Sequence, residues 1–482
     1  MVQTLPSKKK IKSLDEFFGE KNLNNASPKI HCSKYWSWLS DQSSAELIQA
    51  QSEADFLFRR VGITFNVYGD DEGAERLIPF DLIPRIISEK EWIRLEKGLI
   101  QRVTALNEFT NDVYGKGTII NSGVIPPEIV YQSSQYRAEV HGLELPKKTY
   151  AHISGIDLIR AGKGDFFVLE DNLRVPSGVS YMIENRKVMM RLFPEIFALN
   201  SVAPIEHYPD LLLKHLRAIA PTGVDEPVIV VLTPGIYNSA YFEHSYLAQQ
   251  MGVELVEGQD LFVSEGRVFM KTTAGPVRVD VIYRRIDDEF LDPLFFRSNS
   301  SIGVPGILSV VIKGKVTISN AIGSGVADDK AVYPYVPDMI KFYLKEEPIL
   351  QNVKTYLCRI PRHKNYVLNN LHKLVVKETH GAGGYGMLVG PLSTKKQISE
   401  FKVKISNNPY KYIAQPMLAL STCPTFNNKK IVPRHVDLRP FVLNGEGISI
   451  VQGGLTRVAL KEGSIVVNSS QGGGTKDTWV VR

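Results

Sequence analysis

Cysteine is scarce in this chain of 482 residues, which contains only Cys32, Cys358 and Cys423, all far apart. No Cys-x-x-Cys pair and no Cys/His spacing typical of zinc ligands occurs, so neither a disulfide framework nor a structural zinc site is supported. No run approaches the roughly 18 apolar residues of a membrane-spanning helix. Residues 1–12 are polar and basic without an apolar stretch, unlike a secretory signal. We therefore expect a soluble, cytoplasmic protein with no membrane partner.

The excess of one sign of charge is also small, because 57 Lys and Arg against 51 Asp and Glu leave a net charge of +6. Basic residues are dense only at Lys8–Lys10, within 395–411, and at Lys429, Lys430 and Arg434. Proteins dedicated to DNA concentrate such residues on one face or stripe. Solvated surface accounts for these clusters, and a small anionic ligand such as a nucleotide explains a local excess as well as a nucleic acid does. We expect no nucleic-acid partner.

What the chain does have is the composition of a globular protein, with 43% hydrophobic and 22% charged residues. At about 100–200 residues per domain, its length predicts two to four domains or one large composite body. Residues 1–30 are polar and expected to be poorly ordered. Apolar spacing predicts helices over 88–113, 181–199, 208–220 and 393–406. Short apolar runs flanked by turn residues predict strands over 153–158, 166–170, 374–378, 387–389, 412–415, 436–443, 448–452 and 465–467.

Two local patterns in this layout are specific. Ser88 and Glu91 have the spacing of a capping box at the start of the first long helix. Farther along, a strand over 228–232, a helical stretch over 239–251 and a strand over 253–256 make a βαβ-like unit, which predicts a separate parallel sheet.

The most informative segment is a glycine loop between two strands, from residue 375 to residue 389. Its glycines are Gly381, Gly383, Gly384 and Gly386. It is not a Walker A loop, because no Gly-Lys-Ser/Thr follows, and an apolar run follows Gly386 where a dinucleotide-binding turn would begin a helix. Glycines let backbone N–H groups approach phosphate oxygens, and Lys377 on the preceding strand adds positive charge. The loop therefore indicates phosphate binding, and an ordinary hairpin with a glycine-rich turn is the alternative.

Acidic and amide side chains form a second constellation on the strands over 153–158 and 166–170. Glu170 and Asn172 project from one face of their strand because the side-chain period is two, and Asp157 lies on the neighbouring strand. Such oxygens are typical Mg²⁺ ligands. A hydrophilic strand end, or a glycosidase-like pair of Asp157 and Glu170, would leave the same pattern.

Two further strands carry candidate residues. Asp437 and Arg439 share a strand face, so Arg439 reaches either a transferring phosphate or a neighbouring carboxylate. Residues 412–417 suit a hinge that reads an adenine through Gln415 and the backbone of Met417, although an apolar strand ending in proline would look the same. No histidine pairs with serine or cysteine in a recognisable hydrolase arrangement.

Together, several segments resemble the circularly permuted type 2 ATP-grasp proteins, relatives of glutathionylspermidine synthetase. The matching segments are 68–76 (Tyr-Gly-Asp-Asp-Glu-Gly-Ala-Glu-Arg), 79–85, 169–178 (Leu-Glu-Asp-Asn-Leu-Arg-Val-Pro-Ser-Gly), 323–330, 377–386, 421–425, 437–441 and 468–479. The acidic residues precede the lysines and the glycine loop, the reverse of an ordinary ATP-grasp chain. This reversed order of the motifs indicates a circular permutation.

The resemblance implies an α/β (α+β) chain with a circularly permuted ATP-grasp fold and a Rossmann-like βαβ subdomain. We expect residues 31–220 to carry the metal triad and residues 221–290 to form the βαβ-like subdomain, with a possible substrate pocket. Residues 291–482 would form the nucleotide-binding part with the glycine lid.

The resemblance also implies roles for single residues. Asp157, Glu170 and Asn172 would hold Mg²⁺, as in D-alanine ligase. Lys330 and Lys377 would contact the phosphates of ATP. The segment Gly381–Gly386 would form the lid, and Gln415 with the Met417 backbone would meet the adenine.

The chain departs from the family pattern at two places. Related ligases often carry an arginine two residues before the first aspartate, whereas this chain has Gly155, so Arg160, Arg174 or Arg439 would have to replace it. Lys377-Glu-Thr-His380 also stands where a Lys-Pro-Val-Asp-like stretch is expected. Residues that bind glutathione or spermidine in the namesake enzyme do not map onto this chain.

The leading hypothesis is an ATP- and Mg²⁺-dependent carboxylate–amine ligase that works through an acylphosphate. Its substrates would be small-molecule or peptide carboxylates and amines. The alternatives are a nucleotide-binding scaffold that has lost activity and serves an unspecified protein partner, or a phosphotransferase that forms no amide. The sequence names neither the acid nor the amine and leaves the oligomeric state open.

Overall fold

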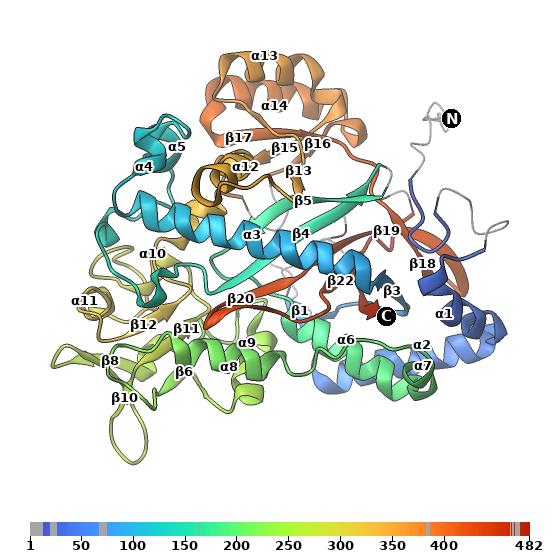
Figure 1. Ribbon diagram of the computed structural model, residues 1–482, viewed down its shortest axis with the longest axis horizontal. Coiled ribbons are helices and arrows are strands. Elements are labelled where there is room, and N and C mark those ends of the chain that lie inside the picture. The colour runs from blue at the N-terminus through green and yellow to red at the C-terminus, as the bar shows by residue number, and fades with distance from the viewer. Residues whose placement is uncertain are drawn as a thin grey trace.

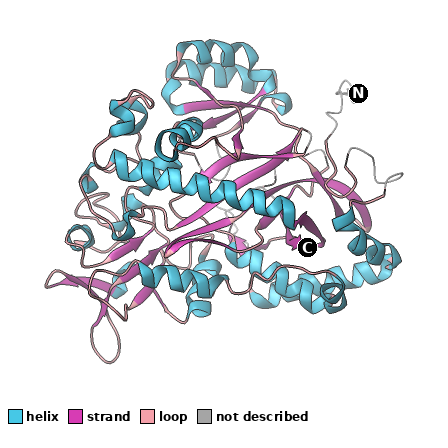
Figure 2. Ribbon diagram, viewed as in Figure 1, coloured by secondary structure: helices cyan, strands magenta, loops and turns pink. Residues whose placement is uncertain are grey.

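The computed structural model describes residues 13–19, 27–66, 75–162, 164–381, 386–462, 464, 467 and 473–482. A large, mainly antiparallel sheet runs through the centre, with helices in front of it and below it (Figure 1, Figure 2). The bounds of the described helices are α1 Ile30–Asp41, α2 Ser44–Val61, α3 Glu89–Val113, α4 Thr118–Asn121, α5 Pro127–Tyr131, α6 Val179–Leu192, α7 Pro194–Leu199, α8 Tyr208–Ala218, α9 Tyr241–Met251, α10 Asp288–Leu291, α11 Ile307–Ile312, α12 Val336–Met339, α13 Pro361–Asn370 and α14 Lys395–Asn407.

The central sheet has ten strands in the described part of the chain. Its main path is β13 Gln351–Asn352, β5 Asp165–Asn172, β4 Ile153–Ala161, β19 Lys430–Arg439, β22 Leu455–Val458, β23 Gly474–Val481 and β3 Phe80–Ser88. β18 Thr422–Asn427 pairs with β19, and β20 Phe441–Gly445 pairs with both β4 and β21 Gly447–Ile450. Strands β3, β4 and β5 from the first 172 residues thus share one sheet with strands from the last third of the chain. This interleaving brings the acidic strands β4 and β5 beside the C-terminal strand β19.

Helix α3 crosses one face of this sheet (Figure 1). The predicted capping box is confirmed, because the Glu91 N–H donates to Ser88 Oγ at 3.4 Å and the Ser88 N–H donates to Glu91 Oε2 at 3.3 Å. Arg102 of α3 donates to both oxygens of Asp171 on β5 at 2.6 Å. Asp171 therefore marks the side of β5 that faces α3, and its neighbours Glu170 and Asn172 lie on the other side.

The predicted βαβ unit is confirmed, since β6 Ile229–Leu232 and β7 Glu254–Val256 pair in parallel and α9 connects them. The parallel sheet continues through β11 Val281–Arg284 to β12 Thr317–Ser319. It therefore extends beyond residue 290, where the sequence placed its end. A described three-stranded sheet adjoins it, formed by β8 Leu261–Ser264, β9 Arg267–Met270 and β10 Val277–Val279.

A small antiparallel sheet lies at the top of the molecule under α13 and α14 (Figure 1). Its described strands are β14 Tyr356–Leu357, β17 Tyr412–Pro416, β15 Leu374–Glu378 and β16 Leu388–Val389. The predicted strand–glycine loop–strand order is confirmed, because β15 and β16 pair antiparallel. Leu374 and Val376 pack with Val367 of α13 and Ile405 of α14, so the alternate residue Lys377 faces away from the helices.

Two predicted elements are each divided in the structure, and proline explains both breaks. The helix expected over 181–199 is α6 followed by α7, which begins at Pro194. The strand expected over 436–443 ends at Arg439 and resumes at Phe441, because Pro440 has no N–H for a ladder hydrogen bond. Most of the strand expected over 465–467 lies outside the described residues. The small pairing of β1 Thr64–Asn66 with β2 Glu75–Leu77 completes the described sheets.

The expectation of a poorly ordered N-terminus is wrong for residues 13–19. The Glu16 N–H donates to the carbonyl of Thr422 at 2.8 Å, and Phe17 is fully buried. The Glu16 carboxylate receives Arg85 Nη2 at 2.6 Å and Arg85 Nε at 2.9 Å, with both side chains buried. Burial raises the pKa of Glu16, but Arg85 and then Arg160 outweigh that effect and lower it to about 2. A sequence scan for apolar periodicity misses so short a segment.

Among the described helices, none is long and apolar enough to cross a membrane.

Replacing Glu16 tests the contribution of the N-terminal segment to stability. Glu16→Ala leaves the Arg85 guanidinium buried without its counter-charge, which should lower the free energy of unfolding by about 3–5 kcal/mol. The matched control is Glu53→Ala on the exposed surface of α2, expected to stay within about 0.5 kcal/mol. Urea denaturation measures both. Equal stability of the two variants would contradict the assignment.

His152 gives the fold a defined acid sensitivity. It is buried, neither ring nitrogen has a hydrogen-bond partner among the described residues, and burial lowers its pKa to about 3. Below pH 6.5 the unfolded chain protonates this histidine, whereas the folded state keeps it neutral. The free energy of unfolding therefore falls progressively as the pH drops from 6.5 toward 3, and His152 causes no such loss above pH 6.5. We expect His152→Leu to reduce the loss of stability between pH 6 and pH 4, by up to about 1.4 kcal/mol per pH unit. His141→Leu, at an exposed position, is the control. Equal slopes for the wild type and His152→Leu would refute the assignment.

Candidate active site

The three residues expected to bind metal lie on one face of the central sheet. In the antiparallel pair of β4 and β5, Asp157 is the direct partner of Glu170, and Gly155 is the partner of Asn172. The Asn172 side-chain amide donates to the Gly155 carbonyl at 3.0 Å. The prediction that Glu170 and Asn172 share a face is therefore confirmed, and the pairing places Asp157 on that face as well; the role of all three as ligands stays a prediction.

Asp157 is held by two arginines. Its Oδ1 accepts Arg439 Nε at 2.5 Å, and its Oδ2 accepts Arg439 Nη2 and Arg457 Nη2, each at 2.8 Å. Only 3% of the residue is exposed. Burial raises the pKa of this carboxyl, but Arg439 and Arg457 outweigh burial and hold it well below its usual range. Asp157 is thus an ionised carboxylate with both oxygens hydrogen-bonded to guanidinium groups.

Arg457 is a site residue that the sequence reasoning missed. It lies on β22 directly opposite Asp437 of β19, and its Nε donates to Asp437 Oδ1 at 2.9 Å. A second contact joins Arg457 Nη2 to Asp437 Oδ2. Asp437 and Arg439 share a face as predicted, and both belong to one alternating network with Asp157 and Arg457. The available signal was a single charged residue within the otherwise uncharged stretch Leu455–Val458.

Gly155 makes room for Arg439. A Cβ placed at Gly155 would lie 3.2 Å from Arg439 Cδ and 3.0 Å from Pro176 Cβ. Arg439 of the neighbouring strand β19 therefore occupies the space next to Gly155, and its taking the place of the arginine expected in related ligases stays a prediction. Of the three candidates, Arg439 is the one that passes over Gly155 and reaches Asp157.

Two lysines approach the same face from other parts of the chain. Lys330 Nζ lies 2.5 Å from Glu170 Oε1 and donates to the Gly381 carbonyl at 2.7 Å. Lys377 is half-buried on β15; burial lowers its pKa, Glu170 opposes this effect, and Lys330 reinforces it. Lys330, Lys377 and Glu170 thus form one electrostatic cluster, whereas contact of the two lysines with the phosphates of ATP stays a prediction.

The candidate adenine residues follow the small sheet. Gln415 is the direct partner of Val375, one alternate position from Lys377, so both side chains lie on the face turned away from α13 and α14. Gln415 Nε2 donates to Thr355 Oγ1 at 3.0 Å, and the Met417 N–H contacts the Lys373 carbonyl at 3.5 Å. Their contact with a nucleotide stays a prediction.

Of the loop glycines, Gly381 and Gly386 are described, whereas Gly383 and Gly384 lie outside the described residues. Gly386 has a positive φ of 70°, and a Cβ there would come within 3.1 Å of Glu378 Oε1. His380, part of the unusual stretch after Lys377, lies with Nδ1 3.3 Å from Asp329 Oδ2. The lid function of this loop stays a prediction.

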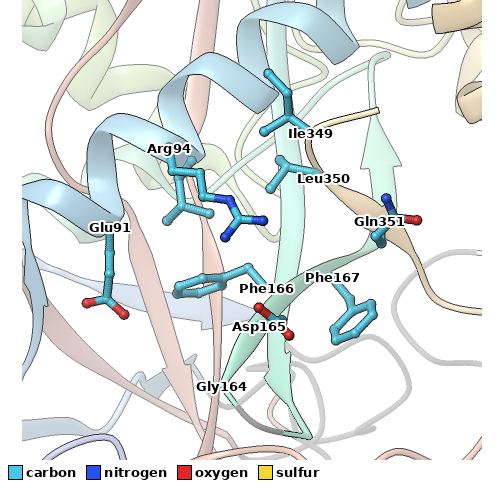
Figure 3. Close-up of a pocket in the computed structure, with 10 residues that line it drawn as sticks. Glu91, Arg94, Gly164, Asp165, Phe166, Phe167, Ile349, Leu350 and Gln351 are labelled. Atoms are coloured by element: carbon cyan, nitrogen blue, oxygen red, sulfur yellow. The ribbon is translucent and has the colours of Figure 1, made fainter. Parts of the chain in front are cut away.

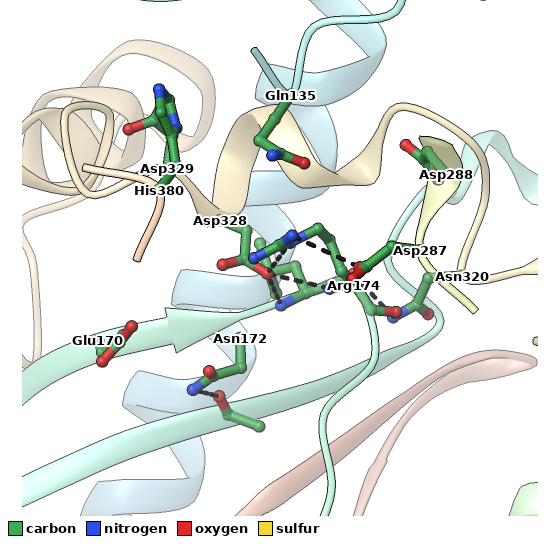
Figure 4. Close-up of polar contacts among 12 residues, drawn as sticks. Gln135, Glu170, Asn172, Arg174, Asp287, Asp288, Asn320, Asp328, Asp329 and His380 are labelled. Carbon is green, nitrogen blue, oxygen red and sulfur yellow. Dashed lines mark hydrogen bonds and ion pairs between the residues drawn. The ribbon is translucent and has the colours of Figure 1, made fainter. Parts of the chain in front are cut away.

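Arg174 lies at the end of β5 in a mixed-charge cluster, between Asp328 and Asp287 (Figure 4). Its Nε donates to Asp328 Oδ2 at 3.3 Å, and its Nη1 lies 3.4 Å from Asp287 Oδ1. Asn320 donates to the carbonyls of Leu173 and Arg174 and so joins the parallel sheet to β5. Arg174 therefore lies close to Glu170 and Asn172 in the chain, but its side chain is directed toward Asp287 and the parallel sheet.

Arg160 is not part of this site. It pairs on β4 with Phe166, on the α3 side of the sheet, and its Nη2 lies 3.0 Å from Glu91 of α3. Position 160 is three residues from Asp157, and an odd spacing on a strand directs the two side chains to opposite faces. The structure thus separates Arg160 from the other two candidate arginines.

A cavity of about 330 Å³ lies on that opposite side (Figure 3). Glu91 and Arg94 of α3 lie across it from Phe166 of β5, and the chain at Ile349–Gln351 closes one edge. The central sheet separates this cavity from Asp157 and Glu170, so it is distinct from the candidate active site.

The oxygens of Glu170 and Asn172 suit a hard divalent cation. The Lys330 ammonium already forms an ion pair with Glu170. The Asn172 side-chain nitrogen donates to the Gly155 carbonyl, which leaves the Asn172 side-chain oxygen available for a metal. Asp157 does not fit in the same way, because both its oxygens carry guanidinium groups. Within the described residues, no cluster of three or more His, Cys, Asp or Glu side chains is arranged to hold a metal.

Comparison with known proteins agrees with this architecture. The profile of the family described as "Circularly permuted ATP-grasp type 2" matches residues 84–459. An uncharacterized protein of Synechocystis sp. (strain ATCC 27184 / PCC 6803 / Kazusa) is 52% identical over 467 residues and covers 97% of both chains. A Frankia alni protein, provisionally named glutamate–cysteine ligase 2-3, is 43% identical over 424 residues, which cover 87% of this chain and 49% of that protein.

The structure of a glutathione synthetase-like effector from Globodera pallida, in its apo form, aligns with a TM-score of 0.60. The alignment covers 92% of this chain and 98% of that chain at 13% identity, a likeness that concerns the fold alone. The family match and the fold likeness together place the chain in the class of ATP-grasp folds. Within this class, the chain belongs to the circularly permuted ATP-grasp type 2 family.

Proposed function

We propose that this protein is an ATP- and Mg²⁺-dependent carboxylate–amine ligase that works through an acylphosphate. The observation that carries the proposal is the convergence of Lys330, Lys377 and Arg439, from three separate segments, on the sheet face that holds Glu170 and Asn172. Membership of the ATP-grasp family supports ATP as substrate. The name of the Frankia alni relative supports a ligase.

In the proposed reaction, a substrate carboxylate oxygen attacks the γ-phosphorus of ATP. A P–O bond forms, the bond to the β-phosphate oxygen breaks, and ADP leaves. The amine nitrogen then attacks the acyl carbon, inorganic phosphate leaves, and the nitrogen loses a proton as the amide forms. Because little covalent chemistry is asked of the protein, its contribution is positioning and charge stabilisation.

The residues divide this work by location. Lys377 and Lys330 would bind the phosphates, and Arg439 would stabilise the negative charge on the transferred phosphoryl group. Glu170 and Asn172 would hold Mg²⁺, which supplies additional charge neutralisation when bound. Gln415 and the backbone of Met417 would contact the adenine, as the sequence predicts.

We further propose that the amine substrate binds where the parallel sheet meets β5. Ligands of open parallel sheets bind beyond the carboxyl ends of the strands, where the strand order reverses, and here that point lies between β6 and β11. Asp287 follows β11, and 42% of its side chain is exposed. Its carboxylate would pair with an ammonium group. Arg174 links this region to Asn172, two residues earlier on β5.

Two other functions stay open to test. The Lys377-Glu-Thr-His380 stretch, unusual for the family, favours a nucleotide-binding scaffold without turnover as the second candidate, with a protein partner still to be identified. A phosphotransferase that stops at the phosphorylated acid would use the same lysines and Arg439.

A turnover assay with carboxylate and amine panels tests the proposal. Wild-type protein with Mg²⁺ and ATP should release ADP and form an amide detectable by mass spectrometry. Lys377→Ala should lower ADP formation by about 100-fold or more, because it removes a cation from the phosphates. Lys396→Ala, an exposed lysine on α14, should leave the rate unchanged. ADP without amide would indicate the phosphotransferase, and ATP binding without ADP would indicate the scaffold.

Gly155→Ala tests the assignment of Arg439. The added Cβ forces Arg439 to move, and a displacement of even a fraction of an ångström at the transferring phosphate should lower kcat by about 10- to 100-fold. If the effect acts through Arg439, Gly155→Ala should add little to the loss already caused by Arg439→Lys. Fully additive losses in the double variant would contradict the assignment.

A further inference from the structure

The carboxylate of Asp157 has different surroundings from the other expected metal ligands. Three of its roughly four lone-pair sites accept N–H bonds, all from permanently charged guanidinium groups. The residue is also 3% exposed. A divalent cation on the remaining site would stand beside two guanidinium charges of the same sign. To become a free ligand, Asp157 would have to release two arginines whose side chains are 13% and 10% exposed.

Glu170 and Asn172 are more open to a cation. Among the described residues, the ionic partner of Glu170 is Lys330, whose flexible side chain allows the ammonium to move away, and 23% of the Glu170 side chain is exposed. Magnesium usually takes one or two protein carboxylates and completes its shell with phosphates and water. One carboxylate and one amide oxygen therefore suffice, without Asp157.

The geometry points to a different role for Asp157: we propose that it is a positioning residue which, together with Arg457, holds Arg439 toward the nucleotide phosphates, and that Glu170 and Asn172 alone supply the protein ligands of the metal. This inference rests on the proposed function. In the same proposal, Arg457 supports Asp157, and Asp437 holds Arg457 in place.

The hydrogen-bond inventory of Arg439 fits this role. Of its five N–H donors, two bind Asp157 and one, on Nη1, binds the Ser177 carbonyl at 3.1 Å. Within the described part of the chain, two donors remain for a ligand. Arg457 has a second carboxylate, Asp437, and is 8% exposed. Arg457 is thus bound to two carboxylates, Asp157 and Asp437, whereas Arg439 is bound to one, so the proposal assigns Arg439 to the phosphates and Arg457 to the support of Asp157.

Binding of Mn²⁺ with the non-hydrolysable analogue adenylyl imidodiphosphate, followed by electron paramagnetic resonance, separates the two roles without turnover. Glu170→Gln should weaken Mn²⁺ binding about tenfold or more. Asp157→Asn should change Mn²⁺ affinity less than about twofold, yet weaken binding of the metal-free analogue in EDTA about as much as Arg439→Gln does. Asp157→Glu should restore much of that metal-free affinity.

Arg457→Gln provides a second discrimination that keeps Asp157 intact. If Asp157 were a metal ligand, removing this competitor would tighten Mn²⁺ binding, whereas the proposal expects no tightening. The proposal is overturned if Asp157→Asn weakens Mn²⁺ as strongly as Glu170→Gln, if Glu170→Gln retains wild-type affinity, or if Arg457→Gln tightens it. Failure of the wild type to bind the analogue would instead overturn the proposed function itself, and this inference with it.

Discussion

The ionic network around Asp157 is the interaction on which the candidate site depends. It joins three strands, β4, β19 and β22, that are neighbours in the sheet but lie about 300 residues apart at the extremes, as the Asp157–Arg457 contact shows. A buried carboxylate is stable only when its charge is compensated, and a buried arginine has the same requirement. Pairing them satisfies both and fixes the register in which the two halves of the chain meet.

The permuted order of the chain becomes understandable from this contact. The acidic strands come early, whereas the lysine of the small sheet and the arginines come late, so the site exists only after β4 has paired with β19 and β20. The N-terminal segment contributes to the same closure, because Glu16 reaches Ser421 beside β18 and Arg85 on β3. Stability and site assembly are therefore properties of the whole sheet and of no separate domain.

Local patterns in the sequence predicted the elements well, because capping, periodicity and glycine placement are local physics. The α3 cap, the parallel βαβ unit and the β15–β16 hairpin follow from neighbouring residues alone. The sequence could not reveal which arginine lies next to Gly155, because that depends on the register of β19 against β4. The sequence did not identify Arg457 for the same reason. Arg160 lies three residues from Asp157, and this spacing excludes it from the site only once both residues are known to lie on one regular strand.

The charges of the site suggest what it binds. Lys330, Lys377, Arg439 and Arg457 bring four positive charges, whereas Asp157, Glu170 and Asp437 bring three negative ones. Asp157 and Asp437 are already committed to arginines, so Lys377 retains an unbalanced positive charge, which burial disfavours, as its lowered pKa shows. An incoming polyanion would relieve this imbalance, whereas a free metal cation would increase it. The charge balance of these residues therefore favours a polyanion over a free metal cation.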